Sequence, residues 1–89
     1  MFYTYVNMSG GALDYLFTKI SYYKEDIEKF LNERIKEEEI SEKTKNKILN
    51  FLEEIKEFLW ALEWWMSADI SYEEFEKYVK EKVRAWESI

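Results

Sequence analysis

The sequence lacks several residue types on which common kinds of protein chemistry depend. Its 89 residues include no cysteine, histidine or proline and only two glycines. Without cysteine the chain has neither a disulfide framework nor a thiolate metal site. Without histidine it also lacks the most common general base and metal ligand. These absences argue against an enzyme and against a bound cofactor or metal, and we predict none of the three.

Long apolar runs are absent as well. No run reaches the roughly 20 apolar residues that cross a membrane, and Glu63 interrupts the most apolar stretch. The N-terminus does not resemble a signal peptide, because it has no basic region followed by an apolar segment. We therefore expect a cytoplasmic protein without a membrane partner. The formal net charge of −6 also disfavours binding to nucleic acid.

The composition that remains is that of a folded domain. Hydrophobic residues make up 47% of the chain and aromatic residues 19%, which is far from the composition of disordered proteins. The length fits a single domain over residues 1–89. Abundant glutamate and lysine, with no glutamine, resemble the composition of thermophile proteins, in which ionic networks are common.

Apolar periodicity predicts three helices joined by short links. The first covers residues 11–38, with Lys24 inside its apolar stripe, so a break near Ser21 remains open. The second covers 42–68 after an N-cap at Ser41, and the third covers 72–88 after a capping box formed by Ser71 and Glu74. Residues 1–8 favour an extended conformation. The predicted fold is all-α, a three-helix up-down-up bundle with a short extended N-terminal segment.

The second helix carries apolar side chains on two sides. At about 100° per residue, one side forms a stripe that we expect to be core: Ile48, Phe51, Leu52, Ile55, Leu59, Leu62 and Met66. Trp60, Trp64 and Leu49 project roughly opposite to that stripe. If both indoles stayed exposed to water, the protein would lose several kcal/mol of possible stabilisation, at about 25 cal/mol per Å² of apolar surface buried. We therefore expect the N-terminal segment, a second subunit, or a ligand or foreign protein to cover them.

Two charged patterns suggest other chemistry. The glutamates at 37–39, at 53, 54 and 57, and at 73, 74 and 76 resemble a set of carboxylates for a divalent cation or for hydrolysis. Most of them lie among lysines on polar helix faces, so we interpret them as solvated. Lys43, Lys45 and Lys47 form the one basic concentration, and alternate helical positions point them in different directions.

The sequence favours a small acidic protein–protein interaction module that forms a homodimer and regulates a larger, basic protein partner. The predicted partner or dimer surface consists of six apolar residues: Trp60, Trp64, Leu49, Phe2, Tyr3 and Tyr5. The alternative is a nucleic-acid accessory protein that uses Lys43, Lys45 and Lys47 together with exposed aromatic residues. The sequence names neither the partner nor the biological process.

Overall fold

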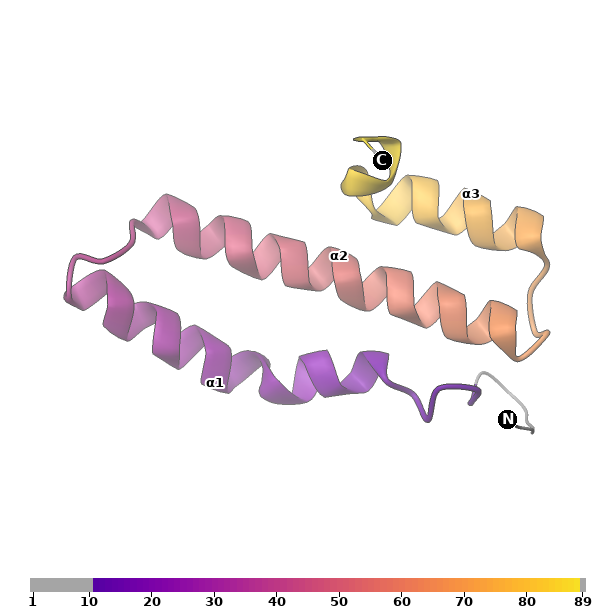
Figure 1. Cartoon of the computed structure of the whole chain (residues 1–89), viewed down its shortest axis with the longest axis horizontal. Helices are drawn as coiled ribbons and strands as arrows, with labels where there is room; N and C mark the ends of the chain where they lie inside the picture. Colours follow the sequence, from indigo (N-terminus) through magenta and orange to yellow (C-terminus); the bar gives the residue numbers. More distant parts are fainter. Residues whose placement is uncertain (1–10, 89) are drawn as a thin grey trace.

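The computed structural model describes residues 11–88, and within this range the chain forms only helices and short connections. The elements are α1 (Phe17–Lys36), α2 (Glu42–Met66), α3 (Tyr72–Lys82) and a 3-10 helix, η1 (Arg84–Ser88). The predicted all-α class with three main helices is confirmed. The extended segment predicted at residues 1–8 lies outside the described range. Along the chain the three helices alternate in direction, and α1 and α3 lie on opposite sides of α2 (Figure 1).

The starts of α2 and α3 follow the side chains that cap them. Ser41 Oγ accepts a hydrogen bond from the backbone N–H of Thr44 at 3.1 Å. Ser71 Oγ accepts one from the N–H of Glu74, also at 3.1 Å, and the Glu74 carboxylate accepts one from the N–H of Ser71 at 2.8 Å. These bonds satisfy N–H groups that have no partner inside the helix. Both predicted caps are confirmed.

The first helix begins later than the sequence predicts. Asp14 and Tyr15 have φ angles of 55° and 57°, in the left-handed region that a right-handed helix excludes. The helix therefore starts at Phe17 instead of residue 11. From there it continues through Ser21 to Lys36 without a break. The lysine at position 24, inside the apolar stripe, therefore does not interrupt the helix.

The third helix ends earlier than the sequence predicts. Val83 follows α3 with φ −122° and ψ 96°, an extended conformation that interrupts the helix after Lys82. This turn of the backbone places the Val83 side chain in the core, where it is buried. The chain then continues as η1 to Ser88. The predicted range of 72–88 is thus two elements instead of one.

The buried core lies mainly between α2 and α3, not under the predicted stripe. Ala61 of α2 packs with Phe75, Val79 and Val83, and all four are buried. None of the seven stripe residues of α2 reaches this degree of burial, and two of them are more than half exposed, Phe51 at 57% and Met66 at 54%. The expectation that this stripe is core holds only in part, because its other five residues are partly buried and Leu62 packs against the buried cluster. α1 and α3 contact α2 on the two flanks of the stripe. The centre of the stripe lies between these two helices.

Both helix–helix connections begin with the same hydrogen-bond pattern, although neither contains glycine. At the end of α2 the N–H of Asp69 donates to the carbonyl of Trp64, and the N–H of Ala68 donates to that of Trp65, both at 2.9 Å. This is a Schellman motif, in which the residue after the C-cap adopts a left-handed conformation that glycine favours. Ala68 occupies that position with φ 63°, and Glu38 does so after α1 with φ 61°.

Replacing Ala68 by glycine should therefore stabilise the protein by about 1 kcal/mol, because glycine adopts this φ without a steric penalty from Cβ. Ala12→Gly is the matched control, since Ala12 is also exposed and does not have a positive φ. Denaturant unfolding at equilibrium measures both. A loss of stability in Ala68→Gly equal to that in Ala12→Gly would contradict the assigned conformation.

Candidate functional site

The predicted core stripe of α2 forms part of a broad apolar surface. We call this surface the apolar face, and it comprises Ile48, Phe51, Ile55, Leu59, Leu62 and Met66 of α2, Tyr23 and Phe30 of α1, and Trp86 of η1, with Leu16, Trp65 and Tyr72 at its edge. Helix periodicity places Tyr23 and Phe30 on this side of α1. The opposite side of α1 is polar, where Lys24 and Glu28 line a shallow depression with Asn50 of α2.

The apolar face contains a hollow beside Phe51. Its volume is about 180 Å³, and six of its seven lining residues are apolar: Phe51, Ile55 and Phe58 of α2, with Val83, Ala85 and Trp86 from the end of the chain. The seventh is Glu54, whose carboxylate accepts a hydrogen bond from the N–H of Ala85 at 3.2 Å. That bond fixes η1 against α2, so the hollow depends on the break at Val83.

Of the two tryptophans that the sequence places at a partner surface, Trp60 packs against α3 and Trp64 packs on Trp60. The Trp60 ring lies 4.7 Å from the ring of Tyr78 and 5.5 Å from that of Trp64, measured between centroids. Both indoles are partly buried. Tyr78 supplies cover from within the chain, a source that the sequence analysis did not consider. A second subunit or foreign partner on the remaining indole surface stays a prediction.

The structure places Leu49 of the predicted surface apart from these tryptophans. Leu49 lines a crevice with Ile20 and Lys24 of α1, and it is about 16 Å from Trp60 along the α2 axis at 1.5 Å per residue. Phe2, Tyr3 and Tyr5 lie outside the described residues. Of the three predicted residues within the described part of the chain, Trp60 and Trp64 lie together and Leu49 lies apart.

Tyr78 joins the aromatic cluster to a carboxylate. Its hydroxyl donates a hydrogen bond to Glu57 Oε1. Burial raises the pKa of Tyr78 well above its ordinary value of 10.0, and the hydrogen bond to Glu57 and the negative charge of that residue raise the pKa further. All three causes favour the neutral phenol.

A raised pKa in the folded state stabilises the protein below pH 10, and this stabilisation decreases as the pH rises above 10. The unfolded chain then loses the Tyr78 proton while the folded chain retains it. We expect the unfolding free energy of Tyr78→Phe to fall less steeply with pH above 10 than that of the wild type. Tyr22→Phe is the control, because Tyr22 is 76% exposed and its removal should leave the slope unchanged. Equal slopes in all three proteins would contradict the Tyr78–Glu57 interaction.

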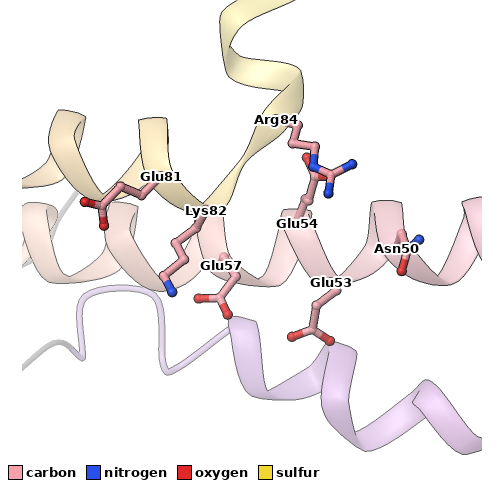
Figure 2. A pocket seen from close by; sticks show the side chains of 7 residues that line it. All are labelled: Asn50, Glu53, Glu54, Glu57, Glu81, Lys82 and Arg84. Atoms are coloured by element: carbon pink, nitrogen blue, oxygen red, sulfur yellow. The ribbon is translucent and has the colours of Figure 1, made fainter.

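The side of α2 opposite the apolar face carries a polar cleft. Figure 2 shows Glu53, Glu54 and Glu57 on α2 facing Glu81, Lys82 and Arg84 from the end of α3 and the start of η1. The cleft volume is about 360 Å³. Three of its carboxylates already have protein partners: Glu53 pairs with Lys56 at 2.7 Å, and Glu54 and Glu57 accept the bonds described above. Within residues 11–88 no group of acidic side chains has the arrangement to hold a metal ion.

A fully buried carboxylate holds the start of the described chain against α2. Glu63 is 0% exposed, and its Oε2 accepts hydrogen bonds from the backbone N–H groups of Leu13, at 2.8 Å, and Tyr15. One turn later, Ser67 Oγ accepts a bond from the N–H of Ala12 at 2.9 Å. We call Glu63 and Ser67 the anchor. In the sequence, the only signal of this role is that Glu63 interrupts an apolar stretch.

Glu63→Gln should reduce the unfolding free energy by about 1–3 kcal/mol, because it replaces a charged acceptor by an amide whose N–H₂ has no acceptor in this buried position. Glu53→Gln, on a partly exposed carboxylate, should change it by less than about 0.5 kcal/mol. Chemical denaturation gives both values. Amide exchange at Leu13 and Tyr15 should also accelerate in Glu63→Gln, and unchanged protection there would show that Glu63 does not hold this segment.

The three lysines on which the alternative of a nucleic-acid accessory protein depends do not form one surface. Lys45 is largely buried against α1 and lies 3.8 Å from carboxylate oxygens of both Glu28 and Glu42. Lys43 and Lys47 are exposed on either side of it. No helix within residues 11–88 combines the length and apolar character that a membrane span requires.

Comparisons with protein-family models, with curated proteins and with solved structures gave no match. The candidate site therefore depends on the geometry of this chain alone. Its best-formed element is the apolar face with its hollow.

Proposed function

We propose that this chain is a small protein–protein interaction module of the cytoplasm that self-associates as a homodimer and acts by binding, without catalysis. The observation that carries the proposal is the apolar face. An apolar surface of this extent that stays exposed among the described residues is typical of an interaction site. The face draws residues from α1, α2 and η1, so the fold as a whole presents it.

The exposed area supports an interface of ordinary size. Seven large side chains of the face and its edge, Leu16, Tyr23, Phe30, Phe51, Trp65, Met66 and Tyr72, are between 38% and 60% exposed. At about 200 Å² each, they leave about 700 Å² of surface in water. A standard protein–protein interface buries about 800 Å² on each partner. The face is thus large enough to carry a stable complex.

Phe51→Glu tests the proposal because Phe51 is the most exposed large apolar residue that α2 contributes to the apolar face. We expect light scattering to give the wild type about twice the mass of one chain, which is 11.0 kDa. Phe51→Glu should be a monomer with unchanged helix content, since a charge buried without a partner costs several kcal/mol at an interface. Tyr22→Glu, on the outer edge of α1, should remain dimeric.

Trp64→Glu distinguishes this surface from the tryptophans that the sequence favours. Loss of the dimer in Trp64→Glu, with retention in Phe51→Glu, would move the interface to the Trp60 and Trp64 side of α2. A wild type that is monomeric at millimolar concentration would exclude self-association altogether.

A further inference from the structure

The hollow of the apolar face lies directly beside the side chain that protrudes most from the same helix. Phe51 is 57% exposed, the largest exposed fraction among the large apolar residues of α2. Its own ring forms part of the rim of the hollow, and Ile55, Phe58, Ala85 and Trp86 form much of the rest. A protruding ring and a cavity that could receive one are therefore neighbours on a single surface.

The size and chemistry of the hollow fit an aromatic ring. Its volume is about 180 Å³, and a cavity of about 150 Å³ with an aliphatic and aromatic lining is sufficient to bind benzene. The lining is apolar apart from Glu54, whose carboxylate already accepts a bond from the N–H of Ala85. A phenyl group would therefore meet little polar surface that it could not satisfy.

A surface that carries a protruding side chain beside a hollow of matching size is self-complementary. In a dimer with twofold symmetry, if residue i of one copy contacts residue j of the other, then j also contacts i. Two such contacts form when one apolar face is laid on another. The inference that follows rests on the proposed function, since it assigns the geometry of the same face.

We infer that two copies associate face to face by reciprocal insertion, with Phe51 of each copy occupying the hollow between Ile55, Ala85 and Trp86 of the other. The two contacts lie close to the twofold axis, where binding energy concentrates in protein interfaces. Burial of both rings also covers the part of the α2 stripe around Phe51 and Ile55.

The occupant is a second copy because the face itself is apolar. A basic partner requires carboxylates on the surface that it binds, and the glutamates of α2 lie mainly on the opposite side, in the polar cleft. Glu54 is the one acidic side chain that lines the hollow, and its carboxylate already accepts a hydrogen bond from the N–H of Ala85. A copy of the chain supplies the matching area and the ring that the hollow accepts.

Ala85→Phe tests the insertion, because it fills the hollow from within and leaves Phe51 unchanged. We expect the dissociation constant of the dimer to rise by about 30-fold or more, as for the loss of a central interface contact. The control is Ala12→Phe, which adds the same ring to an exposed position outside the apolar face. Analytical ultracentrifugation gives both constants, and circular dichroism verifies the helix content.

A cross-linking experiment tests the same contact without enlarging a side chain. The chain has no cysteine, so a mixture of Phe51→Cys and Ala85→Cys chains forms a heterologous disulfide only where positions 51 and 85 of two copies meet. We expect a covalent dimer of these two chains under mild oxidation. The mixture of Tyr22→Cys and Ala85→Cys should give none above the background level.

The outcomes separate the two proposals. A dimer that Phe51→Glu disrupts, but that Ala85→Phe leaves equally tight and that yields no 51–85 disulfide, overturns reciprocal insertion and preserves the self-associating module. A monomeric wild type overturns both proposals. Should Ala85→Phe lose its helix content, the presence or absence of the 51–85 disulfide decides.

Discussion

The position of α2 between two helices that do not share a flank governs the rest of the structure. α1 lies on the flank that includes Leu49 and Glu63, and α3 lies on the flank that includes Ala61. Ala61 is small and fully buried, so the α3 backbone can approach closely. In a closed three-helix bundle, α1 and α3 would also meet over the apolar stripe of α2. Here they remain on opposite sides of it (Figure 1), and the stripe becomes surface.

Partly buried hydrogen bonds to three glutamates hold this arrangement on either side of α2. On the α1 side, Glu63 accepts the N–H groups that precede the helix, and a carboxylate near a helix N-terminus is also favoured by the helix dipole. On the α3 side, Glu54 and Glu57 accept bonds from Ala85 and Tyr78. All three acceptors are glutamates of α2. The high glutamate content of this helix therefore serves packing as well as solubility.

Local signals in the sequence were reliable, and signals that depended on distant residues were not. Ser41, Ser71 and Glu74 act within four residues of where they stand, and they placed two helix starts correctly. The start of α1 depends on Glu63, which is 50 residues away from Leu13, so periodicity extended that helix too far. The Val83 break follows from tertiary burial. Periodicity located the α2 stripe, but it could not show which helices would cover it, and hence it did not identify Phe51 or the hollow.

The location of the core between residues 58 and 86 has a consequence for how the chain folds. Ala61, Phe75, Val79 and Val83 meet across short stretches of sequence, so α2, α3 and η1 form a unit of low contact order that can assemble early. The hydrogen bonds of the anchor span 48 to 55 residues, and closing so long a loop has a larger entropic cost. Residues 12–15 are therefore the part of the described chain that detaches most easily by itself. α1 can stay paired with α2 when they detach, because only the short connection at residues 37–41 separates the two helices.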